Sequence, residues 1–204
     1  MDDIVKDAMA KWPGVPEVYG WLGLDRRGEW LIKGDRISNP MVAGFINRNY
    51  EHDDTGRWFF QNGPQRVYVA LTYTPFIYRI ENDPGADAPM RIETHSGKIA
   101  SRLNTAWIDE AGVVLLVTEY GVGMVDDRDL GRLLPYFTDD SGVPLTEEAV
   151  AEAIERRPSG DIYGLHIRHR DQTVPVRAIA ADKVASQFGF VQSPQQPVGA
   201  KECS

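Results

Sequence analysis

The feature that most constrains this sequence is the pattern Asp-x-x-Gly, which recurs between apolar segments. Its four copies are Asp25–Gly28, Asp53–Gly56, Asp109–Gly112 and Asp139–Gly142. Asp favours the first position of a type I turn because its carboxylate accepts hydrogen bonds from the following backbone N–H groups, and Gly in the fourth position tolerates a positive φ. Turns of this kind close short hairpins. The pattern therefore predicts a chain built largely from antiparallel strands.

The apolar periodicity between these turns locates strands and a few short helices. Strands are expected at residues 19–24, 29–33, 57–61, 65–71, 76–80, 90–94, 106–108, 113–118, 161–170 and 173–179. Helices are expected at residues 40–50, 127–136, 146–156 and 183–188. The first helix has Ser38 or Asn39 as its cap and Pro40 as its first residue, and the second is bent or ended near Pro135. This mixture predicts an α+β fold of antiparallel hairpins and short helices.

A run rich in Pro, Gly and Asp at residues 82–89 is the clearest break in the chain. It predicts an N-terminal α+β sub-domain at residues 1–82 and a C-terminal α+β sub-domain at residues 83–190. From residue 191 the sequence has no periodic apolar residues, so residues 191–204 are expected to form a disordered tail.

The charge balance restricts the classes of partner. The 204 residues include 22 Lys and Arg against 30 Asp and Glu, a formal charge of −8. This acidity is the opposite of the basic surface that nucleic acids and anionic membranes select. The longest apolar stretch, Val113–Val117, is far shorter than the ~20 residues that cross a bilayer. Neither nucleic acid nor membrane is expected as a partner.

Cysteine usage and the first residues indicate the compartment. Cys203 is the single cysteine, so an intrachain disulfide and a cysteine-based metal site are both excluded. The start Met1–Asp7 is acidic, whereas a secretory signal begins with positive charge and continues into an apolar run. We therefore expect a soluble protein in the reducing cytoplasm.

Two motifs suggest cofactor or metal chemistry and fall short of it. Gly121-Val122-Gly123 lies between an apolar strand and a predicted helix, but Asp126 stands where a phosphate-binding turn needs its third glycine. Asp126, Asp127 and Asp129, with Glu119 nearby, do not follow the spacing of a calcium loop. An ordinary strand-to-helix turn and helix capping explain these residues better. No cofactor is expected.

The histidines and serines also lack a recognised catalytic or metal-binding spacing. The four histidines are His52, His95, His166 and His169, and their spacing matches no zinc motif. His166 and His169 are three residues apart on a predicted strand, so their side chains point to opposite faces. No Gly-x-Ser-x-Gly motif is present. No metal site and no hydrolase triad are expected.

The last predicted hairpin carries the most specific candidate site. His166, Arg168 and Arg170 alternate along one strand, and Arg177 lies on the return strand. Residues 156–177 contain five Arg and two Asp, which makes this segment positive within an acidic chain. Arginine suits carboxylate and phosphate ligands because its guanidinium presents a rigid fork of donors. The same pattern also fits a solvated strand face that forms salt bridges to the acidic helix around Glu147, Glu148, Glu152 and Glu155.

The tryptophans leave two interpretations open. Trp30 shares a strand face with Ile32, and Trp58 shares one with Phe60, which indicates core packing. The alternative is an exposed aromatic platform that binds a peptide or a sugar.

The order of motifs in the first half of the chain resembles a known class of protein. From Trp21 to Ile80 these motifs are Gly-x-Trp-Leu-Ile-x-Gly-x-x-Ile, Asn-Pro followed by a Phe-Ile helix, Asp-x-x-Gly-x-Trp, Gln65–Val69 and Thr74-Pro75-Phe76. The pattern resembles a group of uncharacterised bacterial proteins that contain a domain of unknown function. The resemblance implies a small two-part α+β fold in a cytoplasmic bacterial protein with no assigned activity, and it supplies no catalytic residues.

Two hypotheses about function follow from the residues. The first is a non-enzymatic binding or regulatory module for a small anionic ligand or a protein partner. A second copy of the chain, in a homodimer, is one such partner. The second is an enzyme that acts on a small acidic metabolite, with His166 or His95 as acid or base and with Arg168 and Arg177 as clamps. The first is favoured because the sequence contains no recognised catalytic motif.

Overall fold

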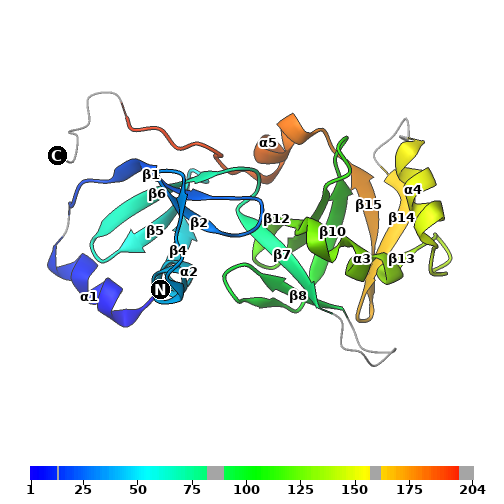
Figure 1. The fold of residues 1–204 in the computed structure, drawn as a ribbon, viewed down its shortest axis with the longest axis horizontal. Coiled ribbons are helices and arrows are strands. Elements are labelled where there is room, and N and C mark those ends of the chain that lie inside the picture. The colour runs from blue at the N-terminus through cyan, green and yellow to red at the C-terminus, as the bar shows by residue number, and fades with distance from the viewer. Residues whose placement is uncertain (13, 82–89, 157–161, 198–204) are drawn as a thin grey trace. The chain divides into compact units, whose positions relative to one another are not determined.

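The computed structural model describes residues 1–12, 14–81, 90–156 and 162–197 (Figure 1). The chain forms two compact units, each described by itself below. Unit 1 comprises Met1–Pro75 and the chain from Ala185, and unit 2 comprises Phe76–Val184. The sub-domain boundary that the sequence suggests, between residues 82 and 83, lies outside the described residues, so that division remains a prediction.

Unit 1 is organised around a mixed sheet. Its described strands form a six-stranded sheet in the order β3-β2-β1-β6-β5-β4. The bounds are β1 Val18–Leu24, β2 Trp30–Ile32, β3 Asp35–Arg36, β4 Tyr50–His52, β5 Trp58–Asn62 and β6 Gln65–Leu71. β1 and β6 pair in parallel, and the remaining neighbours pair antiparallel. The central β1–β6 pair therefore joins an N-terminal hairpin to a later meander.

The helices of unit 1 are α1 at Asp3–Lys11 and α2 at Pro40–Arg48. Asn39 is the cap of α2, because its side-chain oxygen accepts the Met41 N–H at 2.9 Å. Pro40 occupies the first turn, where its missing N–H is no loss. Helix α2 packs against β5 and covers one face of the sheet (Figure 1).

The core of unit 1 is aromatic. Trp30 and Trp58 are 3% and 8% exposed, so the interpretation of these two residues as core is confirmed. Tyr50 lies between them, with ring centroids 5.0 Å from Trp30 and 4.7 Å from Trp58. The Trp30 indole N–H donates to Asn47 Oδ1 at 2.7 Å, which satisfies its one polar atom.

Unit 1 also includes the chain that follows α5 (Val184–Phe188). The Val191 N–H donates to the Gly56 carbonyl at 2.9 Å, and the Leu71 N–H donates to the Gln192 carbonyl at 2.7 Å. Val191 and Gln192 are therefore held by backbone hydrogen bonds, in contrast to the disorder expected from residue 191. Such bonds need no pattern of apolar side chains, which is why the composition did not predict them. Residues 198–204 of the expected tail lie outside the described residues.

Unit 2 is organised around a second mixed sheet. Its described strands form a nine-stranded sheet in the order β13-β14-β15-β10-β11-β12-β7-β8-β9. The bounds are β7 Phe76–Glu81, β8 Arg91–Thr94, β9 Ile99–Ala100, β10 Leu103–Ile108, β11 Val114–Thr118, β12 Gly121–Val125, β13 Phe137–Thr138, β14 Ile162–His169 and β15 Gln172–Ala178. The β10–β15 and β7–β12 pairs are parallel. The α+β class predicted from the sequence is confirmed.

The predicted helix at residues 127–136 is divided into three pieces. A 3-10 turn at Asp127–Asp129 leads into α3 at Leu130–Leu133, and a second 3-10 turn follows at Leu134–Tyr136. Pro135 lies in the last piece, as expected of a residue that interrupts helical hydrogen bonding. Helix α4 spans Glu147–Glu155 and contacts β14. Among the described residues, no helix is long and apolar enough to cross a membrane.

The four Asp-x-x-Gly turns share one geometry, which confirms their prediction as turns. In each, the Gly N–H donates to the Asp carbonyl, and the Asp N–H donates to the carbonyl four residues ahead. Each Asp Oδ1 also accepts from the N–H groups two and four residues ahead, at 2.8–3.2 Å. The glycines have φ between 76° and 81°. Local side-chain chemistry therefore specifies these reversals.

Candidate ligand-binding pocket

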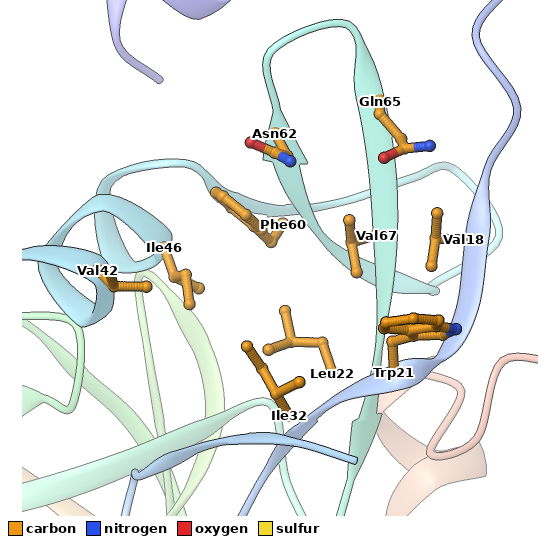
Figure 2. A pocket seen from close by; sticks show the side chains of 10 residues that line it. All are labelled: Val18, Trp21, Leu22, Ile32, Val42, Ile46, Phe60, Asn62, Gln65 and Val67. Carbon is orange, nitrogen blue, oxygen red and sulfur yellow. The ribbon is translucent and has the colours of Figure 1, made fainter. Parts of the chain in front are cut away.

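Unit 1 contains an apolar pocket of about 450 Å³ between helix α2 and one face of its sheet (Figure 2). Ten described residues line it: Val18, Trp21, Leu22, Ile32, Val42, Ile46, Phe60, Asn62, Gln65 and Val67. They come from β1, β2, β5, β6 and α2. The pocket therefore depends on the assembled sheet and helix, not on one loop.

Helix α2 supplies one wall of the pocket. Val42 and Ile46 are four residues apart, so they lie on the same helical face, and both point toward the sheet (Figure 2). Ile46 is only 2% exposed, whereas Val42 is 41% exposed and lies nearer the surface. Behind this wall, Phe45 packs edge-on against Phe60 at a centroid distance of 5.4 Å.

An irregularity in β1 supplies the opposite wall. Val18 pairs with Val67 and Leu22 pairs with Val69, so β1 has two more residues than β6 between these points. Gly20 lies inside this bulge with φ 73°, a conformation that L side chains rarely adopt. The bulge breaks the strict alternation of the strand, and as a result the adjacent residues Trp21 and Leu22 both line the pocket.

The pocket has a buried floor and an apolar rim. Leu22 and Phe60 are buried at the floor, with Ile46 beside them. Trp21 and Ile32 are 50% and 45% exposed, so large apolar side chains remain in contact with solvent at the rim. Side chains of this size are usually buried in a folded chain, and a concave group of exposed ones is typical of a ligand site.

Polar atoms are confined to one end of the pocket, where β5 turns into β6. Asn62 and Gln65 are directly paired across the two-residue connection. Gln65 donates from Nε2 to the Pro16 carbonyl at 3.1 Å, so its amide is oriented. A side-chain amide can donate and accept hydrogen bonds without carrying charge. This end of the pocket therefore suits an uncharged polar group.

A cation lies beside the rim without lining the pocket. The Lys33 ammonium lies 3.8 Å from the centre of a Trp21 ring, a cation–π contact. The Lys33 N–H also donates to the Trp21 carbonyl at 2.8 Å. These two contacts hold Trp21 in place while half of its surface stays exposed.

The lining is apolar apart from the two side-chain amides. None of the ten lining side chains ionises near neutral pH, and none is a nucleophile. Acid–base and covalent catalysis both need such groups. The arrangement is suited to an apolar molecule, and its lining side chains offer neither an acid, a base nor a nucleophile.

The residues predicted as a site from sequence lie in unit 2, on the β14–β15 hairpin. His169 pairs with Gln172, so the two-residue connection is Arg170-Asp171 and not Asp171-Gln172 as expected. Arg170 has φ 57° and lies in this connection. The expectation that Arg170 continues the strand face of His166 and Arg168 is therefore wrong, because the chain reverses one residue earlier.

The other predicted residues do share one face of the hairpin. His166 and Arg168 lie opposite Pro175 and Thr173, and Arg177 lies two residues beyond Pro175. Arg168 is exposed, whereas His166 and Arg177 are partly buried. Among the described ion pairs, none joins Arg168 or Arg177 to the glutamates of α4. His166 Nδ1 instead lies 3.5 Å from Asp140 Oδ1.

His95, the second residue predicted as an acid or base, lies elsewhere in unit 2. It follows β8, which five strands separate from β14 in the sheet order. Its Nδ1 accepts the Ile77 N–H at 3.3 Å. Burial of the ring, with a smaller effect from Lys98, lowers the pKa of His95 to about 3. With this pKa the imidazole ring is neutral near pH 7. It therefore lacks the imidazolium proton that an acid catalyst donates.

The glycines at 121 and 123 lie inside strand β12 and do not form a turn. A Cβ at Gly123 would approach the Tyr78 ring to 2.6 Å and the Phe76 carbonyl oxygen to 2.7 Å. Position 123 therefore requires glycine, because β7 leaves no room for a side chain there. The expectation of an ordinary strand-to-helix turn at Gly121-Val122-Gly123 was wrong, because the strand continues to Val125.

The aspartates that follow β12 form ion pairs with arginines. Asp126 bonds to Arg128, and Asp129 bonds to Arg79 and Arg132. The hydrogen bond from the Arg128 side chain is the main cause that lowers the pKa of Asp126 to about 2. Across the described part of the chain, no three His, Cys, Asp or Glu side chains gather closely enough to hold a metal ion.

Sequence reasoning did not identify the pocket in unit 1. Its residues come from five separate elements, and no short motif joins them. One local signal was available, because a glycine inside a predicted strand suggests a bulge. Gly20 lies directly before Trp21, the tryptophan that the bulge brings to the pocket.

The fold and the pocket together define an α+β protein with a preformed apolar site. The chain belongs to the DUF2944 family, described as "Protein of unknown function (DUF2946)", which matches residues 1–195. The sequence-based resemblance to proteins with a domain of unknown function is therefore confirmed. None of the curated proteins matches the chain.

Two solved structures were compared with the chain. A DUF1285 family protein from Silicibacter pomeroyi DSS-3 is 14% identical, with a TM-score of 0.53 over 88% of this chain and 97% of that one. A DUF1285 family protein from Shewanella baltica OS155 is 15% identical, with a TM-score of 0.41 over 54% of this chain and 87% of that one. The first likeness indicates a related arrangement of strands and helices and no more than that.

Proposed function

We propose that this protein is a non-enzymatic binding module and that the unit 1 pocket holds a small, uncharged, largely apolar molecule. The observation that carries this proposal is a pocket of about 450 Å³ whose lining contains no ionisable side chain. This volume lies within the roughly 300–1,000 Å³ typical of small-molecule sites. The alternative of an enzyme that uses His95 is less well supported, because that ring stays neutral near pH 7.

The shape of the apolar surface favours a small molecule over a protein partner. Stable protein interfaces bury roughly 1,200–2,000 Å² and need an extended, complementary surface. Here Trp21, Ile32 and Val42 surround a concavity with a buried floor. A molecule that enters this concavity removes both rim and floor from water, which gives affinity through the hydrophobic effect.

The polar end of the pocket selects the class of ligand. Asn62 and Gln65 present amides, which match an alcohol, amide or ketone group. A carboxylate or ammonium group would lose its hydration in an apolar pocket without a charged partner in the lining. We therefore expect an aliphatic or aryl chain with an uncharged polar end.

The test uses the neutral fluorescent probe N-phenyl-1-naphthylamine, whose emission increases in apolar surroundings. We expect saturable binding to the full-length protein and displacement of the probe by octanamide. Octanoate and octylammonium have the same chain length and should displace the probe at least about tenfold less well, because each would bury an unpaired charge. Hexanamide should bind more weakly than octanamide, by about fourfold for each CH₂ removed.

Two neighbouring positions on α2 supply the matched variants. Val42 lines the pocket, whereas Met41 is 81% exposed and does not line it. We expect Val42→Glu to abolish probe binding and Met41→Glu to leave it unchanged. Both substitutions add the same charge at exposed positions, so both variants should fold. If the probe does not bind, or if both variants bind it equally well, the proposal is wrong.

A further inference from the structure

A second group of polar atoms lies in unit 2, on one face of the β13–β14–β15 strands. Thr138 pairs directly with His166 across β13 and β14, so their side chains lie on the same face. His166 pairs in turn with Pro175, and Arg177 follows two residues later on that face. Thr138 is therefore the direct neighbour of His166, and Arg177 lies diagonally from His166 on the next strand.

Each of these residues has a buried polar atom that lacks a hydrogen bond. Within the described residues, Thr138 Oγ1, His166 Nδ1 and Arg177 Nε are buried and have no hydrogen-bond partner. Thr138 is only 1% exposed. Asp140 Oδ1 lies 3.5 Å from His166 Nδ1 but does not have hydrogen-bond geometry. Buried polar atoms in folded proteins are nearly always paired, so a group of unpaired ones indicates a site for another molecule.

Each of the three atoms can donate a hydrogen bond. A threonine hydroxyl, a histidine ring nitrogen that carries a proton and an arginine Nε–H are each donors, and the arginine adds permanent positive charge. Arg177 is held in place by Trp107, its direct neighbour on β10, whose ring centre lies 5.6 Å from the guanidinium carbon. The exposed Arg168 adds a second positive charge on the same face.

We propose that this face is a binding site for a phosphate-type oxyanion, which is independent of the unit 1 pocket. Thr138 Oγ1, His166 Nδ1 and Arg177 Nε donate to its oxygens, and Arg168 attracts it from solvent. A tetrahedral oxyanion offers several acceptor oxygens in different directions, whereas a planar carboxylate offers two. Three donors on separate strands therefore match phosphate better than a carboxylate.

The carboxylate of Asp140 leads to a second prediction for this site. Its side chain is 82% exposed and places a carboxylate beside the His166 ring. A bound anion would be repelled by that charge. Asp140→Asn should therefore strengthen anion binding by several-fold.

The experiment titrates the full-length protein with inorganic phosphate at constant ionic strength, by calorimetry and by ³¹P NMR, with acetate as the comparison anion. We expect phosphate to bind more tightly than acetate. Arg177→Gln should weaken phosphate binding by at least about tenfold, because it removes a charge-assisted donor. Thr138→Val keeps the shape of the side chain and should weaken binding by about fivefold, with the circular dichroism spectrum unchanged.

The matched control is Arg170→Gln, which removes the same charge from the connection of the same hairpin. Phosphate affinity should be unchanged in this variant, because Arg170 lies in the turn and not on the strand face. Equal losses in Arg170→Gln and Arg177→Gln would mean that phosphate responds only to net charge. That result, or the absence of phosphate binding to the unmodified protein, would overturn the proposal.

Discussion

Trp107 and Arg177 are direct neighbours where β10 and β15 run parallel, and the guanidinium carbon of Arg177 lies 5.6 Å from the centre of the indole ring. This contact supports a positive charge on a half-buried face without an acidic partner among the described ion pairs. The indole stabilises the cation through its ring electrons, and Arg177 Nε has no hydrogen-bond partner among the described residues. An arginine supported by an aromatic ring can bind an anion, because no carboxylate already neutralises its charge.

The unpaired hydroxyl of Thr138 leads to the first prediction. Thr138→Val should change the free energy of unfolding by less than about 0.5 kcal/mol, because the lost hydroxyl has no described partner and valine preserves the shape. Thr118 is the matched control: its buried hydroxyl bonds to the Tyr78 hydroxyl at 2.7 Å and accepts the Tyr120 N–H at 3.1 Å. Thr118→Val should cost about 1–2 kcal/mol. Urea denaturation measures both, and equal losses would contradict the prediction.

Two glycines with the same backbone conformation should differ in their tolerance of alanine. Gly56 and Gly112 have φ of 77° and 80°, so each substitution should cost about 1 kcal/mol in backbone strain. A Cβ at Gly56 would also collide with the Gly189 carbonyl oxygen, whereas a Cβ at Gly112 would meet nothing within 4 Å. Gly56→Ala should therefore be less stable than Gly112→Ala by about 1–3 kcal/mol. Thermal denaturation compares the two, and similar melting temperatures would disagree with this packing.

The buried carboxylate of Asp129 should be more important to stability than its neighbour Asp127. Asp129 Oδ2 accepts the Ile80 N–H at 3.1 Å, and Asp129 Oδ1 accepts from Arg132 at 3.0 Å. Its arginine partners are partly exposed, so we expect Asp129→Ala to cost only about 2 kcal/mol. Asp127 is exposed, and Asp127→Ala should cost less than about 0.5 kcal/mol. Guanidinium denaturation that ranks the two variants in reverse would refute this account.

His95 should remain neutral through the physiological range of pH. Burial lowers its pKa from 6.5 to about 3, and its Nδ1 accepts the Ile77 N–H, so the proton should lie on Nε2. Between pH 6.5 and 3 the unfolded chain binds a proton that the folded chain does not. The contribution of His95 to stability is therefore complete above pH 6.5 and is lost as the pH falls toward 3.

Long-range ¹H–¹⁵N NMR spectra of the imidazole rings test this prediction for His95 directly. The ring of His95 should keep the pattern of a neutral Nε2–H tautomer from pH 7.5 to pH 5. His95→Gln should reduce the loss of stability between pH 6.5 and pH 4, because the group that protonates on unfolding is absent. A ring that titrates near pH 6.5 would contradict the burial of His95.

Local chemistry made much of the fold predictable. The Asp-x-x-Gly turns, the Asn39-Pro40 start of α2 and the strand at Gln65–Leu71 each depend on residues that are near one another in the sequence. Predictions were less accurate where a longer-range contact decided the outcome. Strand β12 contains two glycines and was expected to be partly a turn, but its packing against Tyr78 on β7 keeps the chain extended. The reversal at Arg170-Asp171 was displaced by one residue, because strand pairing sets the register.

The sequence by itself determined the α+β class, the positions of the four Asp-x-x-Gly turns and the shared face of His166, Arg168 and Arg177, because turn chemistry and strand alternation act over a few residues. Only the tertiary structure decided which polar atoms lack partners and where an apolar pocket lies. Thr138 meets His166 through the pairing of β13 with β14, across residues distant in the chain. Trp21, Ile32 and Val42 meet because a bulge, a hairpin and a helix converge on one sheet face. Such sites arise from packing in three dimensions, which no local pattern of residues specifies.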